Sequence, residues 1–184
     1  MPSRTTFTLP VLVLAALAPA APVGGPGAYA AAPSISCHVA GEAVFSPGVQ
    51  AVGQEHRVGY LGDERDCVDH SGIGIDSARL DAAFEDVRLS CRARDVGGGR
   101  GTATVTWKAG GVELTSVADV EVERTSGDTA TVTGVVREGP FGGRRLTARL
   151  RTGLVGGNGR CAAVNREEAA EVRGSAFTGD LAIG

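Results

Sequence analysis

Apolar and polar residues alternate with a period of two along most of the chain after residue 36. This period is typical of strands with one buried face, because successive side chains of a strand point to opposite sides. The longest alternation, VELTSVADVEVER at 112–124, places one apolar set on a shared face: Val112, Leu114, Ala118, Val120 and Val122. Shorter alternations predict strands at 37–45, around Val58 and Tyr60, and at 101–108, 129–137, 144–152 and 175–183.

Turn-forming residues separate these runs. SPG at 46–48 is expected to end the first strand, and LGDERD at 61–66 is expected to close the second. The glycine-rich GGGRG at 97–101 is interpreted as a hairpin turn, because a phosphate loop would carry G-K-[ST] and lead into a helix. The stretch 153–171 is a long connection whose end, 165–171, is expected to form a helical turn.

The segment 75–95 fits two periods. Ser77 suits a helix cap, and Leu80, Phe84, Val87 and Cys91 follow a helical spacing. Val87, Leu89, Cys91 and Ala93 also alternate as in a strand. We favour two short strands here, because the surrounding chain is made of strands and turns.

The order of strands and short turns predicts an all-β, single-domain antiparallel meander of about eight strands. Closure into an up-and-down barrel is favoured because it removes the exposed sheet edges. A two-sheet β-sandwich is the close alternative, since the same alternation suits both architectures.

The N-terminus resembles an export signal. Arg4 is followed by an apolar run from Leu9 to Ala18, and Ala28-Tyr29-Ala30 supplies small residues for a cleavage site. The run is too short to span a bilayer. We therefore expect residues 1–30 to be a signal peptide and 31–184 to be a single β-rich domain that is secreted, extracellular and off the membrane after cleavage.

The charge disfavours two classes of partner. The whole chain carries a formal net charge of −3, and removal of Arg4 makes it one unit more negative. A negative domain is a poor partner for nucleic acid or an anionic membrane. The local strip of Arg145, Arg149 and Arg151 is interpreted as a solvated face, because alternation places the last two outward.

Four cysteines in an exported protein predict two disulfides, for which three pairings exist. We favour Cys67–Cys91, which brackets one strand-turn unit, with Cys37–Cys161, which ties the first strand to the connection before the last. No cysteine pair has C-x-x-C spacing and the histidines are scattered, so the sequence predicts no metal site and no cofactor.

The sequence offers no coherent catalytic set. Asp66, Asp69, His70 and Ser71 cluster in DERDCVDHSG at 63–72, without a nucleophile elbow or a calcium-loop pattern. We interpret this cluster as a solvated loop. His38 is expected to face solvent, and His56 lies at the start of a strand. We therefore expect a protein that is not an enzyme.

Trp107 and Tyr60 are the candidate binding residues. Trp107 is the only tryptophan, and alternation points both rings inward together with Phe45 and Phe177. A ligand cavity is usually lined by several aromatic side chains, and this chain has few. We favour a core role for Trp107, with the floor of a ligand site as the alternative.

The order of several short motifs resembles a group of small, exported, β-rich actinobacterial proteins without an established activity. The matching features are FSPG at 45–48, Cys67, Cys91, Trp107-x-x-Gly110, Gly134-x-Val136-x-x-Gly139-x-Phe141-x-Gly143, Cys161 and Gly179-x-Leu181-x-Ile183. The resemblance implies a small β-barrel or sandwich and implies no activity.

Taken together, these features predict an exported, non-enzymatic β-protein that binds a small ligand, a wall polymer or another protein. Two alternatives come from other functional classes. One is a secreted protease inhibitor using an exposed loop such as REGPFGG at 137–143. The other is a small β-barrel enzyme of the isomerase or cyclase type, which would need few catalytic groups.

Overall fold

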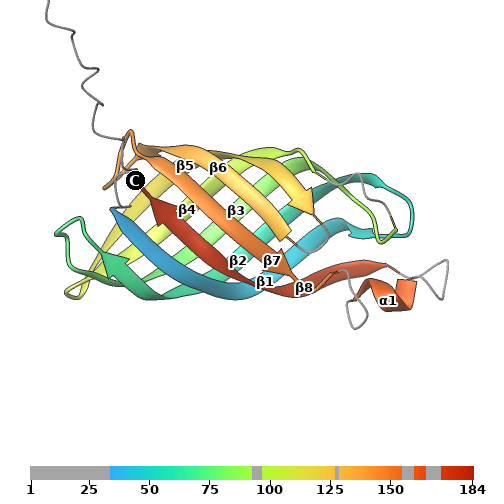
Figure 1. Cartoon of the computed structure of the whole chain (residues 1–184), viewed down its shortest axis with the longest axis horizontal. Helices are drawn as coiled ribbons and strands as arrows, with labels where there is room; N and C mark the ends of the chain where they lie inside the picture. Colours follow the sequence, from blue (N-terminus) through green and yellow to red (C-terminus); the bar gives the residue numbers. More distant parts are fainter. Residues whose placement is uncertain (1–33, 93–96, 127–128, 155–159, 165–170) are drawn as a thin grey trace, which may run out of the picture. The chain divides into compact units, whose positions relative to one another are not determined.

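Eight antiparallel strands close into one barrel in a computed structural model of the chain (Figure 1). Residues 34–92, 97–126, 129–154, 160–164 and 171–184 are described, and the expected signal peptide lies outside them. Each strand pairs with the next, and the last returns to the first. The strands are β1 Ile35–Val49, β2 Gln54–Asp69, β3 Ile75–Leu89, β4 Arg100–Ala109, β5 Val112–Ser126, β6 Thr129–Glu138, β7 Arg145–Thr152 and β8 Val172–Ile183. The predicted meander barrel is confirmed, and the sandwich is not formed.

The alternation of the sequence decides which face of each strand is inside. In β7, Leu146, Ala148 and Leu150 are buried while Arg149 and Arg151 are exposed. The predicted inward sets of β6 and β8 are likewise buried. One expected inward residue, Val112, is 59% exposed, because it begins β5 directly after a tight turn.

Two strands run further than the sequence predicted. SPG does not end the first strand, because β1 continues through it to Val49. LGDERD does not close the second, because β2 extends over it to Asp69. Polar residues of LGDERD such as Asp63 and Arg65 occupy the outer face of the barrel, where solvent accommodates charge within a strand.

The described part of the ambiguous segment, 75–92, contains the single strand β3 in place of two short strands or a helix. The helical spacing has a structural cause in a β-bulge. His56 pairs with Val87 and Val58 pairs with Phe84, so β3 carries one extra residue between these pairs. The extra residue shifts the inward face from even to odd positions and thereby imitates a helical stripe.

The cysteines form two disulfides, but the predicted pairing is wrong. The bonds are Cys37–Cys67 and Cys91–Cys161. The expected partners Cys67 and Cys91 lie at opposite ends of the barrel, one near the end of β2 and the other just after the end of β3. Cys91 instead meets the short helix α1, Cys161–Val164, which precedes β8 (Figure 1).

The helix α1 was not expected at this position. The sequence placed a helical turn at 165–171, a stretch of which 165–170 lies outside the described residues. Within α1, Cys161 and Val164 are buried. Together with the disulfide to Cys91, this burial holds α1 against the barrel.

Candidate functional site

The two predicted binding residues are both buried inside the barrel but belong to separate aromatic clusters. The Trp107 side chain is completely buried, and its ring makes an edge contact with Phe141 at a centroid distance of 5.4 Å. Tyr60 contacts Phe177 and Phe84 at 5.0 and 6.0 Å. Burial raises the pKa of the Tyr60 phenol to about 12. The burial supports the core interpretation of Trp107, while the role of both rings in binding stays a prediction.

The cluster around His70 is a structural turn. Asp69 ends β2, and its carboxylate accepts hydrogen bonds from the hydroxyl and backbone amide of Ser71 and from the backbone amides of Gly74 and Ile75, at 2.5–2.9 Å. Desolvation opposes ionisation, but these hydrogen bonds outweigh it and lower the pKa of Asp69 to about 2. Because the carboxylate is occupied by the turn, it is poorly placed to orient a catalytic histidine.

The three histidines have separate surroundings. His38 faces solvent as expected, with its Nδ1 atom 3.2 Å from a carboxylate oxygen of Asp180. His56 is buried and its Nδ1 atom lies 2.7 Å from the carbonyl oxygen of Pro47. His70 is exposed in the turn after β2. No described contact brings any of these rings onto a serine or threonine hydroxyl.

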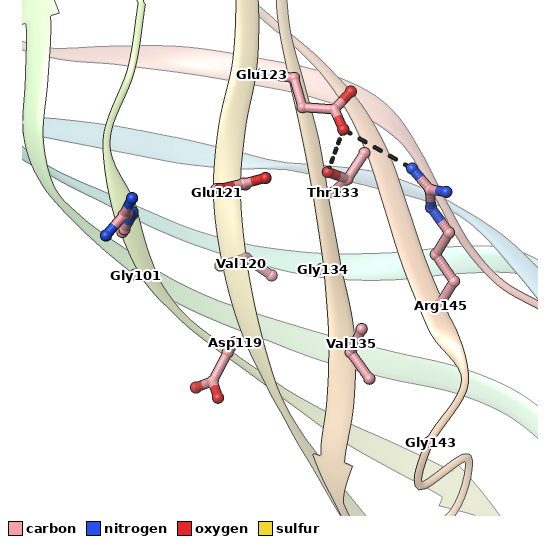
Figure 2. Close-up of a pocket in the computed structure, with 11 residues that line it drawn as sticks. Gly101, Asp119, Val120, Glu121, Glu123, Thr133, Gly134, Val135, Gly143 and Arg145 are labelled. Atoms are coloured by element: carbon pink, nitrogen blue, oxygen red, sulfur yellow. Dashed lines mark hydrogen bonds and ion pairs between the residues drawn. The ribbon is translucent and has the colours of Figure 1, made fainter.

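A groove lies on the outer face of the barrel. It has a volume of about 690 Å³ and runs across the strands from β4 to β7 (Figure 2). We call it the β4–β7 groove. Its lining residues are Arg100, Gly101, Asp119, Val120, Glu121, Glu123, Thr133, Gly134, Val135, Gly143 and Arg145.

Strand register determines how charge is arranged in the β4–β7 groove. Asp119 pairs with Val135, which pairs in turn with Arg145 on the next strand. Val135 is therefore an apolar side chain between an acid and a base, and it is 53% exposed. Two residues further along β5, Glu121 is the cross-strand partner of Arg100 on β4. Figure 2 shows the side chains of Asp119, Val135 and Arg145 on three different strands around the groove.

Weak ion pairs surround Val135. The hydroxyl of Thr133 donates a 2.6 Å hydrogen bond to Glu123, and the same carboxylate oxygen lies 3.8 Å from Arg145. Asp119 lies 3.5 Å from Arg137, outside the groove lining. Exposed ion pairs of this length contribute little stability, so an incoming group can exchange them at small cost.

Glycines form part of the groove floor because the strands approach closely there. A Cβ atom on Gly134 would lie 2.1 Å from the carbonyl oxygen of Asp119, and one on Gly101 would lie 1.8 Å from that of Ala83. Real side chains do not tolerate such distances, so these positions require glycine. Gly134 pairs with the inward-facing Val120 and Leu146, so a side chain there would point into the barrel, and the groove meets only the backbone of Gly134 beside Val135.

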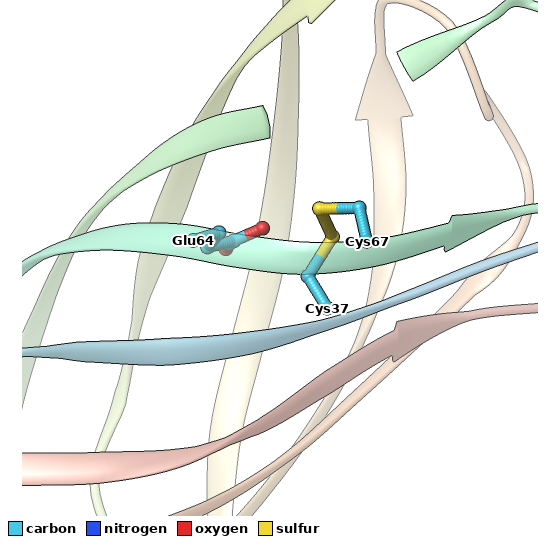
Figure 3. A group of neighbouring side chains, drawn as sticks. All are labelled: Cys37, Glu64 and Cys67. Atoms are coloured by element: carbon cyan, nitrogen blue, oxygen red, sulfur yellow. A yellow bond between two sulfur atoms is a disulfide. The ribbon is translucent and has the colours of Figure 1, made fainter. Parts of the chain in front are cut away.

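A second group of interest lies in the barrel wall near the start of β1. The carboxylate of Glu64 points inward, is 1% exposed and has no hydrogen-bond partner on either oxygen. Its oxygen and the sulfur atoms of Cys37 and Cys67 all lie within 4.8 Å of one another (Figure 3). Desolvation raises the pKa of Glu64 to about 8. Such shifts concentrate at functional sites, although structural groups show them as well.

Neither the groove nor the buried carboxylate was identified from sequence. Glu64 shares the even-numbered inward face of Val58 and Tyr60 on β2. The turn-like composition of LGDERD conceals this continuation of the alternation. The groove depends on the register of four strands, which the alternation of the sequence does not specify.

Comparison with family models, curated proteins and solved structures finds no match to the chain. The two disulfides fit an oxidising environment. Among the residues that the structure describes, no helix combines the length and apolarity needed to cross a membrane.

Proposed function

We propose that the protein is an exported, non-enzymatic binding module that takes a segment of another polypeptide into the β4–β7 groove. The observation that carries this proposal is the half-exposed Val135 side chain, set between Asp119 and Arg145 beside bare backbone. An apolar centre inside a charged rim is the usual anatomy of a protein–protein contact. An apolar side chain of the partner would cover Val135, with a basic residue toward Asp119 and an acidic one toward Arg145.

Among the classes of partner considered, a polypeptide fits the groove better than a small ligand or a wall polymer. The interior is occupied by large side chains such as Trp107, Phe84 and Phe177, each at most 2% exposed, which disfavours a ligand held inside the barrel. Saccharides are commonly held by stacking on aromatic rings, and no aromatic residue lines the groove. The mixed charges of the rim suit a chain that carries both signs.

The inhibitor alternative is disfavoured by the position of Phe141. The loop 139–143 would have to present an exposed side chain to a protease. Phe141 instead packs edge-on against the buried ring of Trp107, and its backbone φ of 71° is one that a non-glycine residue rarely adopts. The Phe141 side chain, at the tip of this loop, thus packs against the end of the barrel.

The test is a selection of displayed peptides on the purified protein with two matched variants. Val135→Arg fills the groove with a long cation, whereas Leu61→Arg makes the same change at an outer-face residue of β2 with a similar exposure of 51%. Enriched peptides should bind the parent protein and Leu61→Arg with dissociation constants of about micromolar order, and Val135→Arg at least about tenfold more weakly. Equal binding by Val135→Arg, or failure to enrich any peptide, would contradict the proposal.

A further inference from the structure

The Cys37–Cys67 disulfide lies between neighbouring strands at a bulge. Ser36 pairs with Val68 and His38 pairs with Arg65, so two residues of β2 stand opposite Cys37. One of them is Cys67, and the other, Asp66, has a φ of 52°. The extra residue shifts the inward face of β2 and brings Cys67 toward the same side as Glu64.

The two cysteines of this bond differ in their exposure to solvent. Cys37 is 3% exposed, whereas Cys67 is only half-buried. The more exposed Cys67 is therefore the side at which a thiolate from solution would attack, with the sulfur of the buried Cys37 as the leaving group. A thiolate released in apolar surroundings is costly, so the departing sulfur needs a proton.

Glu64 is placed to supply that proton. Its carboxyl group lies beside both sulfur atoms and makes no hydrogen bond that would hold the proton elsewhere. The residues facing it from the two adjacent strands, Val39 on β1 and Ala78 on β3, do not titrate. The other inward ionisable groups of β2 are Tyr60 and His56, further along the strand. Glu64 also borders a second groove, which is separate from the β4–β7 groove. The charged outer-face residues that line this second groove are Asp63, Arg65, Arg79, Lys108 and Glu113.

We propose that Cys37–Cys67 is an exchangeable redox disulfide that an external dithiol opens, with Glu64 as the group that protonates the Cys37 sulfur. A thiolate of the dithiol attacks the Cys67 sulfur, and the electron pair of the S–S bond passes to the Cys37 sulfur, which takes the proton of Glu64. The second thiolate of the dithiol then displaces Cys67, which takes a proton from water. The protein gains two thiols, the dithiol becomes a disulfide, and water reprotonates Glu64.

The second disulfide provides an internal control. Cys91 and Cys161 are both buried, at 6% and 2% exposure. Within the described residues, Cys37, Glu64 and Cys67 form the only cluster of three or more cysteine, histidine or acidic side chains with such close ligand atoms. The Cys91–Cys161 bond therefore lacks both a half-buried cysteine and a clustered carboxyl group, and it should remain closed under conditions that open Cys37–Cys67.

The experiment exposes the purified, oxidised protein to dithiothreitol between about pH 6 and pH 9, followed by acid quenching, thiol alkylation and peptide mapping. We expect Cys37 and Cys67 to be alkylated at least about tenfold faster than Cys91 and Cys161. The rate at which Cys37–Cys67 opens, divided by the concentration of dithiothreitol thiolate, is the quantity to compare across pH. It should be constant at low pH and fall as Glu64 loses its proton near pH 8. Equal opening of both disulfides, or faster opening of Cys91–Cys161, would overturn the proposal.

Glu64→Gln tests the proton donor, because glutamine matches the shape of the neutral carboxyl group and cannot release a proton. We expect opening to slow by about tenfold or more below pH 7, as loss of general acid catalysis does, with no change of slope near pH 8. The matched control is Glu113→Gln, which removes an outer-face carboxylate nearby and should retain the parent profile. A parent-like rate and profile in Glu64→Gln, in protein shown to be folded by thermal melting, would eliminate Glu64 from the step and overturn the proposal.

Discussion

The indole Nε1 of Trp107 donates a hydrogen bond to the hydroxyl oxygen of Ser116 at 2.9 Å, between neighbouring strands of the barrel. Both side chains are buried. The Ser116 hydroxyl lies 3.5 Å from the carbonyl oxygen of Pro140, in the loop that carries Phe141. The only polar atom of the ring is thus satisfied inside the core, which is the condition for burying a tryptophan without penalty.

The first prediction concerns the ring itself. Trp107→Ala should lower the free energy of unfolding by about 3–5 kcal/mol, because it removes a large buried side chain and leaves a cavity. Urea denaturation measures the change. In the folded parent protein, the fluorescence of Trp107 should be blue-shifted and resistant to iodide. Efficient iodide quenching, together with an unchanged stability of the alanine variant, would show that the ring is accessible.

The second prediction isolates the hydrogen bond. Ser116→Ala should cost about 1–3 kcal/mol, because it leaves the buried indole N–H without an acceptor. The same change in a Trp107→Phe background should cost less, since phenylalanine has no N–H to satisfy. A double-mutant cycle from denaturation curves gives the coupling energy. Equal costs in the two backgrounds would mean that the bond contributes nothing specific.

The third prediction concerns the pH dependence of stability. The folded protein holds the Glu64 proton up to about pH 8, whereas the unfolded chain releases it near the ordinary value of 4.5. Folding therefore binds a proton in this interval, and Glu64 makes the unfolding free energy fall as pH rises from about 4.5 to 8. The fall is about 1.4 kcal/mol per pH unit and on the order of 5 kcal/mol in total.

Glu64→Gln removes this contribution, so the difference in stability between parent and variant should change with pH over that range and level off on either side. Comparison with the parent cancels the other carboxylates. Urea denaturation at intervals between pH 4.5 and 9 measures the difference, and Glu113→Gln should track the parent throughout. A parallel pH dependence of parent and Glu64→Gln would show that the buried carboxyl group titrates normally.

The fourth prediction tests the close strand approach beneath the groove. Gly134→Ala should destabilise the barrel by about 3 kcal/mol or more, since its Cβ would collide with the carbonyl oxygen of Asp119. Gly142→Ala is the matched control, because a Cβ there would lie 3.4 Å from its nearest neighbour, the carbonyl oxygen of Gly139. Thermal melts compare the two variants, and similar melting temperatures would contradict the close approach of β5 and β6.

Much of the fold was predictable because alternation in a barrel has a simple physical origin. The inward positions of β6, β7 and β8 follow directly from the period of two. The errors arise where one extra residue enters a strand, as before Val87 on β3 and before Cys67 on β2, and shifts the alternation. Neither bulge carries glycine at the extra residue, since Asp66 and Asp86 adopt the positive φ angles instead. The sequence therefore contains little that indicates these two bulges.

The disulfide pairing could not be predicted because it depends on the height of each cysteine in the barrel. Cys37 and Cys67 sit at the same height on neighbouring strands, and Cys91 lies at the other end. That height follows from the true length of β2, which the charged LGDERD concealed. The β4–β7 groove could not be predicted for a related reason. Its arrangement depends on the register of Val135 against both neighbouring strands.

The most direct test of the proposed function is to locate the bound partner on the protein. Nuclear magnetic resonance of the ¹⁵N-labelled protein, titrated with a peptide enriched in the selection, reports each backbone amide. Binding in the β4–β7 groove predicts the largest shift changes at Gly101, Gly134 and Val135, with little change at Tyr60 and Trp107. Largest changes at the interior residues, or at the outer faces of β1 and β2 around Leu61, would contradict the account.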